Sequence, residues 1–240
     1  MKKNLLTLSA AALLAAPFGV ARADLVFNGL VDLGGTGLGA VNTVLTIANS
    51  PTELGCVSWN GTTTVLGATL AGTGQCTGAG DQNGLNSTQL LSATGVTTGA
   101  NYAILFNPAE PGNDQTVTLN TLVATFYNNA GTLIFSAPLH VANQTFNAAD
   151  QGTGNTGFEF ILSPTEAATL QGFITALGTS NIHVGLVSTL GVPASSDGAH
   201  ETFFVFNSGI ATVTPEPSTT VLMATGLFGL VGFVRRRRSW

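Results

Sequence analysis

The positive charges of this chain are confined to its two ends, and this limits its fold and its ligands more than any other feature. The seven Lys and Arg residues are Lys2, Lys3, Arg22, Arg235, Arg236, Arg237 and Arg238. All twelve Asp and Glu residues lie between Asp24 and Val234, where no Lys or Arg occurs. The whole-chain formal charge of −5 therefore conceals a strongly anionic body.

This distribution excludes several classes of function for residues 24–211. Recognition of phosphate and nucleic acid depends largely on Arg and Lys, so we expect no nucleic-acid or nucleotide partner. A catalytic lysine and salt bridges from Lys or Arg are impossible there. Attraction to an anionic membrane surface is disfavoured. The acidic groups must stay solvated, accept backbone hydrogen bonds or bind cations.

Residues 1–23 have the three parts of a secretory signal peptide. Two lysines begin the segment, a mostly apolar stretch follows, and Ala21 and Ala23 are small residues suited to a signal peptidase site. The pattern predicts cleavage before Asp24 and export of the remaining chain. The alternative interpretation is an uncleaved N-terminal helix.

The C-terminal region predicts a membrane anchor. Residues 219–234 contain no charged side chain, and their length is near the lower limit for crossing a hydrocarbon core of about 30 Å. The block from Arg235 to Arg238 follows at once, and such a block stays on the cytoplasmic side. We therefore expect a transmembrane helix over 219–234, with the body outside the inner membrane and residues 235–240 in the cytoplasm.

The order of parts in this tail resembles a known sorting signal. The motif residues Pro215, Glu216, Pro217 and Ser218 precede the apolar segment, and the Arg block ends it. This order is similar to the PEP-CTERM signal of Gram-negative bacteria that make exopolysaccharide. The resemblance implies recognition by an exosortase, removal of the tail and passage of the body to the cell surface or matrix. It covers the tail alone and implies no activity for the body; an ordinary C-terminal anchor is the alternative.

The chain therefore divides into five predicted parts. They are a signal peptide (1–23), a secreted domain (24–211), a linker with the recognition motif (212–218), a transmembrane helix (219–234) and a cytoplasmic end (235–240). The secreted part is long enough for one domain with a hydrophobic core.

Short β-branched and aromatic runs between turn residues predict that this domain is mainly β. Residues 122–127 and 132–137 form the clearest pair, because "NNAG" between them is suited to a hairpin turn. The segment 50–61 is interpreted as a loop or a short edge strand. One short helix is expected after Ser163, with Pro164 in its first turn and Glu166 completing a capping box. The pattern favours a single antiparallel β-sandwich with Greek-key connections.

Cys56 and Cys76 are the two cysteines of the chain. Because export places them in an oxidising compartment, we expect a disulfide. Two free thiols are the alternative.

Calcium is the metal that the sequence favours, since hard cations bind clustered oxygen atoms. The candidate ligands are Asp81, Asn83, Glu110, Asp114, Asp197 and Glu201. Solvated turns are the alternative interpretation, because Asx residues often bond to their own backbone. A zinc site would need His140, His183 and His200 to converge, as no H-E-x-x-H motif is present.

The sequence offers weak candidates for catalysis or for sugar binding. No G-x-S-x-G motif occurs. Glu159 and Glu201 are the pair that a glycosidase hypothesis would use. The aromatic candidates for a carbohydrate-binding face are Trp59, Tyr102 and Tyr127.

We expect a noncatalytic surface or matrix protein without a cofactor other than the calcium considered above. Signal peptidase and an exosortase are the expected processing partners, and exopolysaccharide is the expected surroundings. A carbohydrate- or calcium-dependent binding module or adhesin is the alternative, and a secreted hydrolase is the third hypothesis.

The missing cations lead to a direct test. Trypsin should leave the processed body uncut even after unfolding in urea, because the enzyme cleaves after Lys or Arg and none occurs between Asp24 and Val234. Mass spectrometry of the digest checks this, with an unfolded lysine-containing protein as the digestion control. Tryptic fragments of the processed body would show that the predicted segment boundaries are wrong.

Overall fold

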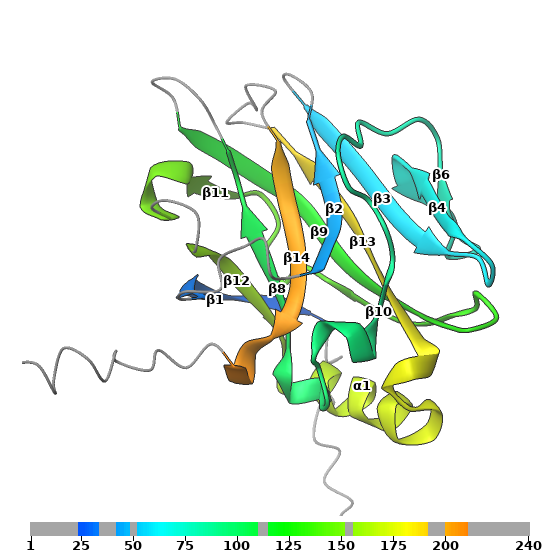
Figure 1. Ribbon diagram of the computed structural model, residues 1–240. Helices are drawn as coiled ribbons and strands as arrows, with labels where there is room; N and C mark the ends of the chain where they lie inside the picture. Colours follow the sequence, from blue (N-terminus) through cyan, green and yellow to red (C-terminus); the bar gives the residue numbers. More distant parts are fainter. Residues whose placement is uncertain are drawn as a thin grey trace, which may run out of the picture.

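The computed structural model describes residues 24–33, 42–48, 52–109, 115–151, 156–191 and 200–210 (Figure 1). The predicted signal peptide, linker motif and transmembrane helix lie outside these ranges, so their geometry stays a prediction. The described residues form two main antiparallel sheets and one α-helix.

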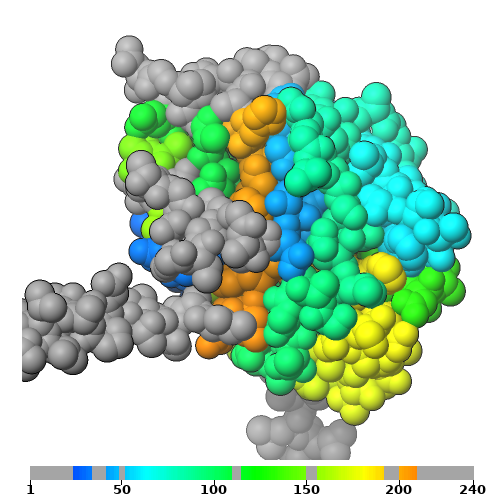
Figure 2. All heavy atoms as spheres, viewed as in Figure 1, coloured from blue at the N-terminus to red at the C-terminus, as the bar shows by residue number. Residues whose placement is uncertain are grey.

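The first sheet has five strands. Their order across the sheet is β1 (Leu25–Asp32), β12 (Thr156–Leu162), β8 (Tyr102–Asn107), β14 (Glu201–Asn207) and β2 (Asn42–Ile47). Every neighbouring pair is antiparallel. Figure 2 shows β14 and β2 running side by side across the face in view.

The second sheet has seven strands. Its main order is β10 (Leu133–Pro138), β9 (Thr116–Asn128), β13 (Ile182–Leu190), β3 (Glu53–Trp59) and β4 (Thr64–Gly67). Two short strands extend it, since β11 (Gln144–Asn147) pairs with β9 and β7 (Gln89–Leu90) pairs with β13. A separate small hairpin joins β5 (Thr69–Leu70) and β6 (Cys76–Thr77).

Helical segments are few and lie between strands. The α-helix α1 (Pro164–Leu177) lies at one end of the two sheets (Figure 1). Five short 3-10 turns complete the described elements: η3 (Leu91–Thr94), η4 (Gly99–Asn101), η5 (Ala148–Gln151), η6 (Thr179–Asn181) and η7 (Ser208–Ile210). The predicted mainly β, antiparallel character with one helix is confirmed, whereas the sandwich and Greek-key assignments stay predictions.

Aromatic rings from both sheets fill the main core. Phe106 and Phe203 from the first sheet stack with centroids 4.8 Å apart, and Tyr102 meets Phe126 of the second sheet at 5.0 Å. All four side chains are fully buried. Burial of each such side chain is worth about 1.5–3 kcal/mol, so the contacts between these rings hold the sheets together without ion pairs.

The hairpin predicted at "NNAG" is confirmed as the β9–β10 turn. Asn128 closes it, because the Asn128 N–H donates to the Thr132 carbonyl at 3.0 Å and the Asn128 Oδ1 accepts from the Thr132 N–H at 3.0 Å. Gly131 has a φ of +80°, which favours glycine. The sequence pattern and the local backbone therefore agree.

The prediction of a loop or edge strand over 50–61 was wrong, because β3 lies inside the second sheet between β13 and β4. Gly55 explains the difference. A Cβ on Gly55 would lie 2.3 Å from Ile47 Cγ2 and 2.8 Å from Leu45 Cδ1, so the missing side chain lets the sheets approach. The packing of β3 against β2 of the other sheet therefore requires glycine at position 55.

The predicted disulfide between Cys56 and Cys76 is present, with a sequence separation of 20. It holds the loop that contains β5 and β6 against a second apolar cluster, where Cys56 packs with Val187 and Val123. The Cys76 N–H donates to Ser58 Oγ at 2.9 Å, which adds a polar link beside the disulfide. The long glycine-rich loop is therefore attached along the sheet.

Replacing both Cys56 and Cys76 with Ala should lower the free energy of unfolding by about 3 kcal/mol, because the unfolded chain regains the entropy of an open loop. Urea unfolding followed by circular dichroism measures this loss. Reduced wild-type protein is the matched control and should unfold near the same urea concentration as the double variant. An unchanged midpoint in the oxidised wild type and the variant would contradict the stabilising role.

Candidate functional site

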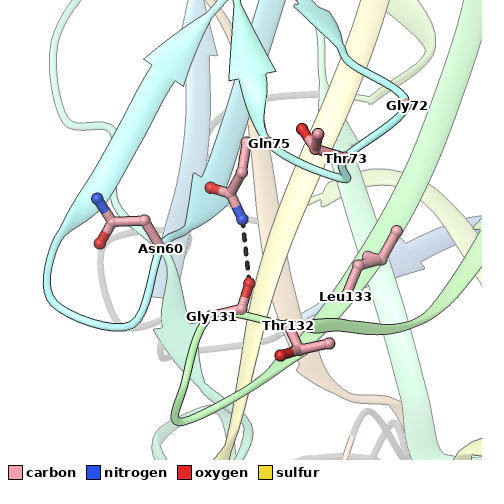
Figure 3. A pocket seen from close by; sticks show the side chains of 7 residues that line it. All are labelled: Asn60, Gly72, Thr73, Gln75, Gly131, Thr132 and Leu133. Carbon is pink, nitrogen blue, oxygen red and sulfur yellow. Dashed lines mark hydrogen bonds between the residues drawn. The ribbon is translucent and has the colours of Figure 1, made fainter.

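Two hollows flank the β9–β10 turn. The larger, of about 490 Å³, is lined by Asn60, Gly72, Thr73, Gln75, Gly131, Thr132 and Leu133 (Figure 3). The smaller, of about 330 Å³, is lined by Asn128, Asn129, Ala130, Ala176, Leu177 and Asn181. None of these described lining residues carries a charge, so the two hollows form an uncharged region on an anionic body.

Gln75 ties together the three segments that make the larger hollow. Its Nε2 donates to the carbonyl of Trp59 at 3.0 Å and to the carbonyl of Gly131 at 3.1 Å (Figure 3). Its Oε1 accepts from Ser58 Oγ at 3.3 Å. The end of β3, the disulfide-bonded loop and the β9–β10 turn are therefore fixed relative to one another.

Glycine allows two of these segments to touch. A Cβ on Gly131 would lie 2.1 Å from the Asn60 carbonyl carbon, and one on Gly61 would lie 2.6 Å from the Ala130 carbonyl oxygen. Any larger residue at either position would push the loop after β3 away from the β9–β10 turn. The shape of the hollow thus depends on direct packing between the backbones of the loop after β3 and of the β9–β10 turn.

Free polar groups remain around this hollow. Asn60 Oδ1 accepts from the N–H groups of Thr62 and Thr63, both at 2.9 Å, while no hydrogen bond within the described residues engages its Nδ2. Thr73 and Thr132 are exposed, and both side chains line the hollow. Amide and hydroxyl groups can therefore donate and accept hydrogen bonds here.

The smaller hollow is built from amides as well. Asn129 Nδ2 donates to Asn181 Oδ1 at 2.7 Å, and Asn181 Nδ2 donates to the Leu177 carbonyl at 2.7 Å. These contacts connect the β9–β10 turn with the C-terminal end of α1. Trp59 Nε1 donates to the Asn129 carbonyl at 3.3 Å and joins this network to β3.

Trp59 stacks on His183 beside these amides. The two ring centroids lie 4.0 Å apart and the planes differ by 5°. Burial lowers the pKa of His183 below its ordinary value of 6.5, so the imidazole is neutral at pH 7. Trp59, the aromatic residue predicted for a carbohydrate-binding face, thus lies next to the uncharged hollows and is only partly exposed.

The two tyrosines predicted for the same face are both buried, so that part of the prediction was wrong. Tyr102 lies in the main core, and its burial raises the pKa of its hydroxyl. Tyr127 lies under the disulfide-bonded loop, where its hydroxyl donates to the Gly74 carbonyl at 2.7 Å. Burial also raises the pKa of Tyr127.

The calcium candidates do not meet within the described residues, which contain no group of three His, Cys, Asp or Glu side chains able to hold a metal ion. Asp81 instead anchors its loop, because its Oδ2 accepts from the Leu54 N–H at 3.0 Å. The Asn83 N–H donates to the Thr46 carbonyl at 2.9 Å. Glu110, Asp114 and Asp197 lie outside the described residues.

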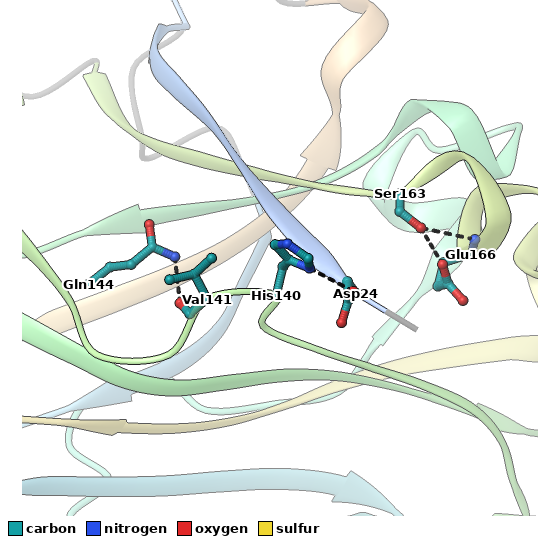
Figure 4. A network of polar contacts seen from close by, with 6 residues as sticks. All are labelled: Asp24, His140, Val141, Gln144, Ser163 and Glu166. Carbon is teal, nitrogen blue, oxygen red and sulfur yellow. Dashed lines mark hydrogen bonds and ion pairs between the residues drawn. The ribbon is translucent and has the colours of Figure 1, made fainter. Parts of the chain in front are cut away.

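The three histidines occupy different surroundings. His183 stacks on Trp59, and His200 is exposed just before β14. His140 Nδ1 lies 2.7 Å from Asp24 Oδ2 (Figure 4). The described residues therefore give no support to a zinc site made by all three.

The glycosidase pair is buried. Glu159 is 6% exposed and accepts a hydrogen bond from Asn28 Nδ2 at 2.6 Å, and Glu201 is fully buried in β14. Neither carboxylate lines one of the two hollows. Glu159 and Glu201 therefore do not face each other across an open cleft, as the two carboxylates of a glycosidase would.

Asp24, the predicted first residue after signal cleavage, is already part of the fold. Its carbonyl accepts from the Ser163 N–H at 3.0 Å, and the His140 N–H donates to the carbonyl of Leu25 at 2.8 Å. Ser163 caps α1 as predicted, since it contacts the Glu166 carboxylate and its Oγ accepts from the Glu166 N–H at 3.5 Å (Figure 4). The fold thus includes the residue that directly follows the predicted cleavage site.

The residues of the targeting segments lie outside the described residues. They are Ala21 and Ala23 of the cleavage site, Pro215, Glu216, Pro217 and Ser218 of the motif, and Arg235 to Arg238. The part of the chain that the structure describes has no helix with the length and hydropathy needed to span a membrane.

Comparison with protein families decides the nature of the tail. Residues 213–238 match the family model of the PEP-CTERM protein-sorting motif. The chain carries a PEP-CTERM sorting motif. No curated protein and no solved structure matches the chain. The motif supports processing by an exosortase and sorting to the cell surface, and it does so for the tail alone.

Sequence reasoning missed most of the residues around the hollows. Gln75, Thr132 and Asn181 stand in segments rich in Gly, Asn and Thr, where nothing separates a lining residue from an ordinary turn residue. Gln75 and Gly131 are 56 positions apart. One sequence feature could have predicted a site in this region. Trp59 is the one tryptophan of residues 24–211, and an Asn-Gly pair follows it directly.

Burial of His183 predicts a pH dependence of stability. Its pKa is lowered in the folded state, so below pH 6.5 the unfolded chain binds a proton more readily and stability falls. His183→Phe keeps an aromatic ring and should lose less stability than the wild type between pH 7.5 and pH 5. Urea midpoints at both values measure the difference. Equal losses of stability in the wild type and the variant between pH 7.5 and pH 5 would contradict the prediction. As a control, a further rise in pH above 7.5 should change the stability of both proteins by the same amount.

Proposed function

We propose that the chain is a noncatalytic protein of the cell surface or exopolysaccharide matrix. Its C-terminal tail is processed by an exosortase, and its anionic body is the delivered product. The observation that carries the proposal is the match of residues 213–238 to the sorting motif, joined to a body that has no Lys or Arg.

Several features support a noncatalytic body. The two candidate carboxylates, Glu159 and Glu201, are buried, and the described hollows are lined by amides, hydroxyls and small residues. Such groups bind and orient ligands, but they titrate far from neutral pH and are poor general acids or bases.

A carbohydrate-binding module is the second candidate. The uncharged hollows beside Trp59 favour it, because sugar hydroxyls pair well with amide and hydroxyl side chains. A calcium-dependent mode has less support, since Asp81 and Asn83 anchor their loop to β3 and β2. A protein of the cell surface or matrix can also bind carbohydrate, so the second candidate is compatible with the first and makes it more specific.

Deleting the exosortase of the producing bacterium tests the sorting proposal. The normal strain should release or display a chain that has lost its C-terminal tail, and the deletion strain should retain the full tail in the inner membrane. Fractionation followed by intact-mass measurement distinguishes the two forms.

Changing Pro215, Glu216 and Pro217 to Ala in the normal strain is the matched control and should reproduce the deletion phenotype. A chain with the same C-terminal mass and the same location in all three strains would overturn the proposal. If the deletion strain lost the body from the surface while the C-terminal mass stayed the same as in the normal strain, the tail would serve as an anchor and would not be processed.

A further inference from the structure

We propose that the two hollows around the β9–β10 turn form one extended binding site for an uncharged polysaccharide chain. The inference rests on the proposed function, because it names the ligand class that would hold the body in a polysaccharide layer. It adds a location, a chemistry and a ligand length to that function.

The size and lining of the larger hollow fit sugar units. Its volume of about 490 Å³ lies in the usual range for small-ligand sites, about 300–1,000 Å³. Asn60 Nδ2 and the hydroxyls of Thr73 and Thr132 offer donors and acceptors, and Leu133 offers an apolar surface. A sugar ring presents hydroxyl edges and C–H faces, which these groups complement.

The preformed state of the hollow favours binding. Gln75 is fully engaged by Trp59, Gly131 and Ser58, so the walls are already fixed before a ligand arrives. A site that needs no ordering of loops loses less entropy on binding. Asn60, Thr73 and Thr132 come from three different segments around Gln75 (Figure 3).

Charge selects against acidic ligands. The body has no Lys or Arg to pair with a carboxylate or sulfate, and its many acids repel anions. His183 stacks on Trp59 beside these amides, and burial lowers its pKa, which disfavours the cationic form that could attract an anion. A neutral chain of sugars meets no such repulsion.

The two hollows share the β9–β10 turn in their linings, which favours a polymer over a single sugar. Consecutive residues of one turn line different hollows: Ala130 belongs to the smaller and Gly131 to the larger. A ligand that crosses this turn would occupy both. We therefore expect oligosaccharides to bind more tightly than monosaccharides.

Affinity gel electrophoresis tests the site directly. The full chain, expressed with its own export signals and purified, is run in native gels that contain dextran, glucomannan or xyloglucan as neutral probes, or alginate or hyaluronan as acidic probes. At least one neutral probe should retard the protein, and the acidic probes should not. Addition of EDTA should leave the retardation unchanged.

Asn60→Asp tests the larger hollow. The carboxylate keeps the acceptor for the Thr62 and Thr63 N–H groups, while the free donor is lost, so we expect binding to weaken by about tenfold. Asn147→Asp is the matched control, because Asn147 Oδ1 also accepts a backbone N–H, that of Ala149 at 2.9 Å, and lines neither hollow. The control should bind like the wild type.

Ala176→Gln tests the smaller hollow. The longer side chain fills space there and should weaken binding of long oligosaccharides, while short ones held in the larger hollow keep their affinity. Ala168→Gln is the matched control, since Ala168 is exposed on the same helix and lines neither hollow. Both changes alter helix propensity equally.

The outcomes separate this inference from the sorting proposal. Absence of retardation by every neutral probe, equal binding by the Asn60→Asp and Asn147→Asp variants, or retardation by acidic probes alone would overturn the site. A chain that reaches the surface but fails these tests would leave the sorting proposal intact. A chain that binds as predicted but never leaves the inner membrane would overturn sorting alone.

Discussion

Gln75 holds three segments together through neutral hydrogen bonds to Ser58, Trp59 and Gly131. The same solution recurs around it: Asn86 Oδ1 accepts from the Thr46 N–H at 2.7 Å, and Gln82 Nε2 donates to the Cys56 carbonyl at 3.2 Å. With no cationic side chain available, loops are tied to strands by amides. Because these bonds carry no net charge, their strength depends little on ionic strength.

Three of the acids also have neutral or weakly basic partners. Asp81 and Glu159 accept hydrogen bonds from a backbone N–H and a side-chain amide, and Asp24 meets the exposed imidazole of His140. Repulsion among like charges opposes a compact fold, but it also keeps molecules apart in solution. The aromatic core, the disulfide and the amide ties offset that repulsion, and the uncharged hollows at the β9–β10 turn stand apart from it.

Local chemistry made part of this structure predictable. Ser163 and Glu166 specify the start of α1, and the "NNAG" turn specifies the β9–β10 hairpin, because both signals act within a few residues. The interior position of β3 was not predictable, because it depends on pairing with β13 and β4 and on the contact of Gly55 with Ile47 from the other sheet. Tyr127 was misjudged because a loop from another part of the chain covers it. The hollows depend on pairings between distant segments, which one sequence cannot reveal.

The disulfide next to Gln75 has a consequence for the timing of assembly. Cys76 adjoins the residue that fixes the larger hollow, and its partner Cys56 lies in β3. In a reducing cytosol this covalent link does not form, so a chain that has not been exported lacks one tie of the loop beside the larger hollow. Oxidation outside the inner membrane then locks the loop in place. The covalent attachment of this loop is therefore complete only in an oxidising compartment.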